Sequence, residues 1–175
     1  MPMTDSDELL LLGLLSGAAM HGYRLNDVIR SRLGQIEGAP RPSTAYARLA
    51  KLAERGLVRS RAQRQGRFPE RRIYELTEAG RDRFLALLRS CLRDPQASVD
   101  VAVMFLRALP RDEWARLLDE RQSALVTQRD AFARLRDAHG RSSPAHWLAK
   151  RRLALLDAES DWFDQLRSEA AIDRL

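Results

Sequence analysis

Basic side chains gather in one stretch of this 175-residue chain, between Arg41 and Arg72. The stretch holds ten Lys or Arg residues against two acidic residues, a local net charge of +8. Guanidinium and ammonium groups bind phosphates, and arginine also forms paired hydrogen bonds with guanine. The expected chemistry is therefore binding of a polyanion, and double-stranded DNA is the expected partner.

A short helix is predicted at the start of this basic stretch, over Thr44–Arg55. Ser43 is the predicted N-cap, and Gly56 is the predicted stop. Ala45, Leu49, Leu52 and Ala53 fall at helical spacing and predict the buried side. The opposite side is expected to carry Thr44, Ala47, Arg48, Lys51 and, one turn further, Arg55.

A basic β-hairpin is predicted directly after this helix. Two strand-like runs, 57–62 and 72–77, flank a turn over Arg64–Arg71 that contains Gly66 and Pro69. A helix followed by a basic hairpin is typical of a winged helix, in which the helix enters the major groove and the hairpin follows the DNA backbone or enters the minor groove. The predicted DNA-binding residues are Tyr23, Ser43, Thr44, Tyr46, Ala47, Arg48, Lys51, Arg64, Arg67, Arg71 and Arg72.

Two simpler interpretations stay open at this point. In the first, the helix face is an ordinary solvated surface. In the second, the hairpin charges only keep the edge strands soluble. The tyrosines also have two interpretations, because each hydroxyl suits a phosphate and each ring suits a core. We assign Tyr46 to DNA and Tyr74 to the core, and we interpret His21 as a hydrogen-bonded residue at a helix start, not as a metal ligand.

The remaining elements are predicted to be helical. A first helix is expected over 7–15, with Asp5 or Ser6 as its cap, and a second over about 20–32. Thr77 is expected to cap a fourth helix. Further helices are expected over about 99–109, which is apolar nearly all round and therefore buried, and over about 112–138 and 145–170.

The two halves of the chain differ in charge. The net charge of +6 lies entirely within residues 1–95, and residues 96–175 are neutral. The sixth and seventh predicted helices carry apolar stripes, Trp114 to Leu135 on one and Leu148, Leu155, Trp162 and Leu166 on the other, that a small winged helix cannot cover. A second copy of the chain is the expected cover, with an intramolecular helical subdomain as the alternative.

The predicted fold class is mainly α with a small β-wing. Residues 1–93 are expected to form an N-terminal winged helix-turn-helix DNA-binding domain, and residues 94–175 a C-terminal helical dimerisation domain. The second domain is also expected to hold a candidate pocket for a small hydrophobic or aromatic effector. The alternative is that the large apolar side chains of this domain only pack against one another. The candidate effector-binding residues are Met104, Phe105, Trp114, Trp147 and Trp162.

The residues do not indicate a metalloprotein, an enzyme or a membrane protein. Cys91 is the single cysteine, so neither a disulfide nor a zinc site is expected, and no metal or cofactor is predicted. Glycine-rich phosphate loops and nucleophile motifs are missing, so no enzyme is predicted. The apolar run Leu9–Leu15 is too short to cross a membrane and follows acidic residues, which indicates a cytoplasmic protein.

Several motif pieces together resemble the PadR family of bacterial transcriptional regulators, over residues 8 to about 82. They are Leu12-Gly13-Leu14-Leu15, Met20-His21-Gly22-Tyr23, Ser43 to Leu49, Glu54 to Val58 and Arg72 to Gly80. The resemblance implies a dimeric winged-helix repressor whose C-terminal helices form the dimer. Thr44 and Tyr46 match the family's Thr-x-Tyr, but Ala45 stands where a larger aliphatic residue is common, which leaves base specificity open.

The predicted function is therefore that of a dimeric transcriptional repressor. It is expected to bind an inverted-repeat operator and to be released by a small hydrophobic effector. The alternative is a winged-helix module that binds a protein, without sequence-specific DNA binding.

Overall fold

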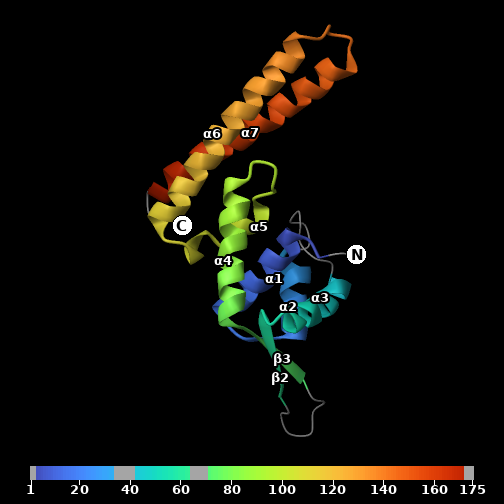
Figure 1. The fold of residues 1–175 in the computed structure, drawn as a ribbon, viewed down its shortest axis with the longest axis vertical. Coiled ribbons are helices and arrows are strands. Elements are labelled where there is room, and N and C mark those ends of the chain that lie inside the picture. Colours follow the sequence, from blue (N-terminus) through green and yellow to red (C-terminus); the bar gives the residue numbers. More distant parts are fainter. Residues whose placement is uncertain (1–2, 34–41, 64–70, 172–175) are drawn as a thin grey trace. The chain divides into compact units, whose positions relative to one another are not determined.

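The computed structural model of the chain describes residues 3–33, 42–63 and 71–171. The chain forms two compact units (Figure 1). The first unit is built from Met1–Leu92 and Gln96–Leu109 and contains a small antiparallel sheet. The second unit, Arg93–Pro95 and Pro110–Leu175, is helical. The predicted fold class, mainly α with a small β-wing, is confirmed.

Helix α1, Asp5–Gly17, lies in the middle of the first unit (Figure 1). All its leucines except Leu14 are buried, on every side of the helix, and Leu9 and Leu15 are 1% and 3% exposed. The N-cap is Thr4, not Asp5 or Ser6 as predicted. Thr4 and Asp7 form a capping box, in which the Asp7 N–H donates to Thr4 Oγ1 at 3.1 Å and the Thr4 N–H donates to Asp7 Oδ2 at 2.9 Å.

The second predicted helix divides into three elements. Met20–His21 is strand β1, Gly22–Val28 is helix α2, and Ile29–Leu33 is a π-helical turn. Strand β1 pairs with a strand far along the chain, with Met20 opposite Tyr74. His21 stands at the start of α2 as predicted, but its side chain makes no capping hydrogen bond there.

Helix α3, Pro42–Glu54, corresponds to the helix predicted over Thr44–Arg55. It begins earlier than predicted, so Ser43 lies inside the first turn and is not the N-cap. Its end is a Schellman motif, in which the Leu57 N–H donates to the Leu52 carbonyl at 2.9 Å and the Gly56 N–H to the Ala53 carbonyl at 3.0 Å. Gly56 has a φ of 72°, a conformation that favours glycine, so the predicted stop is confirmed.

The sheet has three antiparallel strands in the order β1-β3-β2. Strand β2 is Val58–Gln63 and strand β3 is Arg71–Leu76. Their register runs from Val58 opposite Leu76 to Gln63 opposite Arg71, which confirms the predicted hairpin. Residues 64–70, most of the predicted turn, lie outside the described residues.

Helix α4, Glu78–Arg93, is attached to the hairpin through Thr77 and Gly80. Thr77 Oγ1 accepts the Gly80 N–H at 3.0 Å, which confirms Thr77 as the cap, and donates to the Gly56 carbonyl at 2.8 Å. A Cβ atom on Gly80 would lie 2.0 Å from the Leu57 carbonyl oxygen. Only glycine permits α4 to begin this close to the first residues of the hairpin.

The segment after α4 differs most from the prediction. The single helix expected over 99–109 is broken into helix α5, Asp100–Val103, and a 3-10 turn, Leu106–Ala108. It belongs to the first unit, not to a domain that begins at residue 94. The reason is the Phe105 ring, which fills the space beside Gly13 and meets Phe84 edge-on, with 5.6 Å between the ring centroids.

The second unit is a hairpin of two long helices, α6, Arg111–Asp137, and α7, Pro144–Ala171. Both helices agree with the predicted ranges to within one residue at each end. Trp114, Leu117, Leu118, Arg121 and Leu125 of the predicted α6 stripe are buried. No helix within the described ranges is long and apolar enough to cross a membrane.

Arg121 is the most deeply buried charge of the second unit, with 1% of its side chain exposed. Its Nη2 donates to Glu159 Oε1 at 2.5 Å, its Nη1 donates to the Asp94 carbonyl, and its guanidinium lies 5.4 Å from the Phe163 ring centroid. A buried charge must be paired and fully hydrogen-bonded to be tolerated. Arg121 therefore joins α6, α7 and the segment that follows α4.

We expect Gly80→Ala to destabilise the first unit, because its methyl group would overlap the Leu57 carbonyl oxygen. Overpacking of this kind costs about 1–3 kcal/mol in the free energy of unfolding. Urea denaturation followed by circular dichroism measures the loss. Gly17→Ala is the matched control, because no atom lies within 4 Å of its Cβ position and its stability should be unchanged or slightly raised. Equal stability of the two variants would contradict the close approach of α4.

Candidate nucleic-acid interface

The rotation of α3 decides which of its residues face outward. Ala45, Leu49 and Leu52 are at most 1% exposed and form the buried side. The exposed side consists of Tyr46, Ala47, Ala50, Lys51 and Glu54. Its two alanines leave the helix backbone accessible, so that a large partner can approach it closely. Sequence reasoning missed Ala50, although its spacing of three from Ala47 and four from Tyr46 places it on the same side.

Arg48 does not share this exposed side, which corrects its predicted position. Its Nη1 donates to Asp7 Oδ1 at 2.5 Å, and the two side chains are 14% and 5% exposed. Residue 48 lies at the edge of the buried stripe, from which a long side chain reaches α1. The buried carboxylate of Asp7 requires a cation, and Arg48 supplies it. Thr44, also predicted on the outer side, is half-buried.

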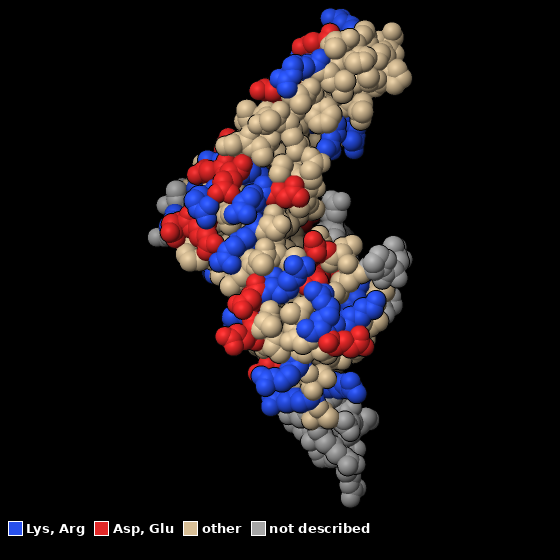
Figure 2. Space-filling model, in the orientation of Figure 1, with Lys and Arg blue, Asp and Glu red and all other residues tan. Residues whose placement is uncertain are grey.

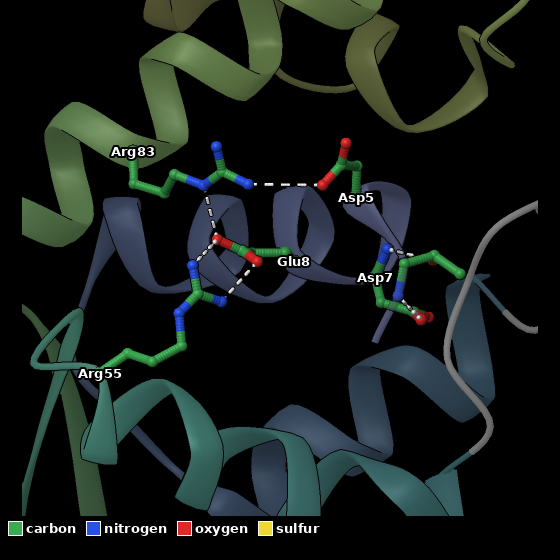
Figure 3. A network of polar contacts seen from close by, with 6 residues as sticks. Asp5, Asp7, Glu8, Arg55 and Arg83 are labelled. Atoms are coloured by element: carbon green, nitrogen blue, oxygen red, sulfur yellow. Dashed lines mark hydrogen bonds and ion pairs between the residues drawn. The ribbon is translucent and has the colours of Figure 1, made fainter. Parts of the chain in front are cut away.

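A second carboxylate of α1 holds the far end of α3 (Figure 3). Glu8, 5% exposed, accepts hydrogen bonds from Arg55 Nη1 at 2.7 Å and Nη2 at 3.1 Å, and from Arg83 Nε on α4 at 2.7 Å. Arg83 also contacts Asp5 at 3.4 Å. Arg55 directly follows the last residue of α3 and its side chain is 45% exposed, as an outward cation would be, but its guanidinium is paired with the buried Glu8.

The hydrogen bonds decide the ionisation of Glu8. Burial raises the pKa of the Glu8 carboxyl, but the hydrogen bonds from Arg55 and Arg83, with their positive charges, outweigh it and lower the pKa below its usual value. The hydrogen bond to Glu8 also raises the pKa of Arg55. Glu8 and Arg55 therefore stay charged at neutral pH, and the hydrogen bonds of Glu8 to Arg55 and Arg83 join α1 to the end of α3 and to α4.

The predicted tyrosines divide as expected between core and surface. Tyr74 is 5% exposed, which confirms its assignment to the core, whereas Tyr46 is 46% and Tyr23 is 51% exposed. The Tyr46 ring lies against Gly22, 2.5 Å from where a Cβ would stand, and this contact explains a glycine at the start of α2. Tyr23 stacks on His21, with 5.5 Å between the ring centroids.

The hairpin adds exposed cations to Lys51 of α3. Arg59 and Arg61 on β2 and Arg72 on β3 are all exposed. Figure 2 shows Lys and Arg side chains gathered where the hairpin leaves the body of the first unit, next to the atoms drawn in grey. Arg59 and Arg61 were not among the predicted site residues, although their alternation in the strand was a usable signal.

Four of the predicted DNA-binding residues cannot be placed in full. Arg64 and Arg67 lie outside the described residues. The backbones of Ser43 and Arg71 belong to α3 and β3, but their side chains are outside the described part of the chain. Their DNA-binding roles remain predictions.

The five candidate effector-binding residues are divided between the two units. Met104 and Phe105 belong to the first unit, and Trp114, Trp147 and Trp162 belong to the second. Trp114 on α6 is 8% exposed and is therefore buried, whereas Trp147 and Trp162 on α7 are 58% and 39% exposed. The last two stand fifteen residues apart on α7, or about 22 Å along a helix. They therefore do not line a common pocket within one unit.

The elements of the first unit define a class of protein. Helices α1 to α3, the β2–β3 hairpin and the short strand β1 form a winged helix-turn-helix domain. An outward helix with small residues and a basic hairpin beside it are the parts that such domains use on duplex DNA.

The sequence of the same region is similar to a family of transcriptional regulators. Residues 11–86 match the model of the Transcriptional regulator PadR-like family. A curated relative, the negative transcriptional regulator PadR of Bacillus subtilis (strain 168), is 28% identical over 132 residues, which cover 71% of this chain and 72% of the relative.

Solved structures of similar proteins include two from Bacillus species. The crystal structure of Bacillus subtilis PadR in complex with operator DNA is 22% identical, covers 91% of this chain and 96% of that chain, and has a TM-score of 0.46. The PadR-like transcriptional regulator from Bacillus cereus is 17% identical, covers 97% of each chain and has a TM-score of 0.43.

The Glu8 network makes a prediction about stability in acid. Because the pKa of Glu8 is lower in the folded protein than its ordinary value of 4.5, the stabilisation is complete above pH 4.5 and is lost as the pH falls through the lower, folded-state pKa. Glu8→Gln should remove this part of the acid dependence. At neutral pH it should lower the free energy of unfolding by about 1–3 kcal/mol, because two arginines lose a charged acceptor.

Urea denaturation of both proteins across this pH range measures the effect. Glu54→Gln is the matched control, since Glu54 is exposed on α3 and its change should leave the acid dependence as it is. If Glu8→Gln and wild type lose stability in parallel as the pH falls, the network does not carry the stabilisation assigned to it.

Proposed function

We propose that this protein is a homodimeric, sequence-specific DNA-binding repressor. The observation that carries the proposal is the combination of two neighbouring surfaces. One is the outward side of α3, with small residues and Lys51, and the other is the hairpin with exposed Arg59, Arg61 and Arg72. Phosphate contacts give affinity, and base contacts made by a close-fitting helix give specificity. The match of residues 11–86 to the PadR-like family model supports this function.

The two surfaces take different parts in binding. Tyr46, Ala47, Ala50 and Lys51 enter the major groove, where the alanines allow the backbone to approach base edges and Lys51 binds a phosphate. Arg72, with Arg59 and Arg61, binds phosphates beside the groove. Tyr23, Ser43, Thr44, Arg64, Arg67 and Arg71 complete the proposed DNA-binding set.

Dimerisation is supported by apolar residues that the chain leaves uncovered. On α7, Leu148, Leu155 and Trp162 follow one another at intervals of seven residues and are 53%, 47% and 39% exposed. The buried residues Leu156 and Phe163 face α6 instead. A repeat of seven residues is the spacing of a helix–helix contact, and the same stripe on a second copy is its proposed cover.

A two-fold dimer determines the form of its operator. Two copies of α3 would enter successive major grooves about 34 Å apart, so the operator is an imperfect inverted repeat. Repression is proposed because the B. subtilis relative is named a negative transcriptional regulator. For a small hydrophobic effector, Trp162 is the best-placed candidate, since it is exposed at the end of the stripe that forms the proposed dimer contact.

The salt dependence of DNA binding tests the proposed contacts. Each phosphate contact adds about 0.9 to the slope of log affinity against log salt concentration. We expect Arg72→Ala and Lys51→Ala each to lower the slope by about this amount, as measured by fluorescence anisotropy with duplex DNA. Arg141→Ala removes the same charge from the exposed loop between α6 and α7 and should leave the slope unchanged. Unchanged slopes for Lys51→Ala and Arg72→Ala would favour the protein-binding alternative.

The oligomeric state tests the proposed dimer contact. Leu155→Glu would place a charge in the middle of the exposed stripe, so we expect it to convert a dimer into a monomer in sedimentation velocity. Ala154→Glu is the matched control, because Ala154 is also exposed but lies one residue, or about 100° of helix rotation, away. A dimer that Leu155→Glu leaves intact, or a monomeric wild type, would contradict the proposal.

A further inference from the structure

We propose that Asp7 is a positioning residue for DNA recognition, which holds Arg48 within the first unit and thereby fixes the rotation of α3. The inference rests on the proposed function, since it concerns how the same helix is presented to DNA. It gives Arg48 a different role from Lys51. Arg48 places the helix and binds no phosphate, whereas Lys51 is a direct contact.

The carboxylate of Asp7 is held in one orientation. Its Oδ2 accepts the Thr4 N–H at 2.9 Å and its Oδ1 accepts Arg48 Nη1 at 2.5 Å, while its own N–H donates to Thr4 Oγ1 at 3.1 Å. Both carboxylate oxygens are therefore used. The cap of α1 thus fixes a side chain that in turn fixes α3.

A second ionic contact lies at the C-terminal end of α3. Arg55 directly follows the last residue of α3, and its N–H still donates to the Lys51 carbonyl. Because Arg55 is seven residues after Arg48, it lies on about the same side of the helix, about 10 Å along the axis. Its partner is Glu8, the residue next to Asp7. Two contacts at this spacing prevent the rotation that either contact alone would allow.

The rotation matters because it selects the residues offered to the groove. A shift by one residue position turns a helix by about 100°. Such a turn would move Ala47 and Ala50 away from the exposed side and bring bulkier side chains into their place. Base contacts depend on this close approach, whereas phosphate contacts by the hairpin do not.

The burial of Asp7 argues against a direct role of Arg48. If Arg48 left Asp7 to bind a phosphate, a carboxylate that is 5% exposed would remain without its cation. An unpaired buried charge is strongly destabilising. The geometry therefore favours an ion pair that persists in the DNA complex.

The experiment compares two duplexes of equal length, one selected from a random pool by the wild-type protein and one of scrambled sequence. Affinities are measured at several salt concentrations, below the unfolding temperature of every variant. The variants are Asp7→Asn, Arg48→Met, the double variant and Arg48→Lys. Lys51→Met is the control for a direct contact. Leu88→Ala, at a fully buried position of α4, is the control for lost stability alone.

We expect Asp7→Asn and Arg48→Met each to weaken binding to the selected duplex by about tenfold, the loss of one well-placed base contact. The double variant should be no weaker than either single variant, because both remove the same pair. The salt slope and the affinity for the scrambled duplex should stay at the wild-type values. Arg48→Lys should retain specificity, Lys51→Met should lower the slope on both duplexes, and Leu88→Ala should leave specificity unchanged.

Other results would overturn the assignment. A salt slope lowered by about 0.9 in Arg48→Met would make Arg48 a phosphate contact. Tighter binding by Asp7→Asn would mean that Asp7 competes with DNA for Arg48. Arg48→Met can be measured even if Asp7→Asn does not fold. If Arg48→Met keeps the wild-type ratio of affinities for the selected and the scrambled duplex, the Asp7–Arg48 pair only stabilises the fold and does not position α3 for DNA. A wild type that selects no duplex would instead reject the proposed function itself.

Discussion

Two adjacent carboxylates buried at the start of α1 constrain the whole winged-helix unit. Asp7 and Glu8 are nearly inaccessible to solvent, and buried charges are tolerated only when cations pair with them. Arginines from α3 and α4 meet this requirement, with Arg48 on Asp7 and both Arg55 and Arg83 on Glu8. The leucines of α1 supply the apolar contact, and the carboxylates determine how the surrounding helices are turned about it.

This constraint divides the basic residues of the region between two tasks. Some of the cations that the composition alone assigns to DNA pair with buried carboxylates of α1. The outward side of α3 keeps Lys51 as its cation, beside two alanines. Exposed arginines are instead found on β2 and β3. We therefore propose that the hairpin supplies affinity for DNA and that the helix supplies specificity, as phosphate and base contacts do in general.

Local signals predicted most of the fold. Helical periodicity identified α3, α4, α6 and α7, and Gly56 and Thr77 marked ends that the structure confirms through a left-handed backbone and a capping hydrogen bond. What the sequence did not predict depends on distant partners. The two-residue strand β1 exists only because β3 pairs with it, and Arg48 turns inward because of a carboxylate 41 residues earlier. Phe105 likewise joins the first unit because Gly13 leaves room for its ring.

We propose that the first unit presents α3 to specific DNA and that the α7 stripe pairs two such units. Sequencing of genomic DNA recovered with the purified protein at moderate salt, followed by footprinting, tests both proposals together. We expect an inverted repeat whose half-sites are centred about 34 Å apart, one helical turn of DNA. Recovery of fragments without a shared sequence, or protection of a single isolated half-site, would contradict it.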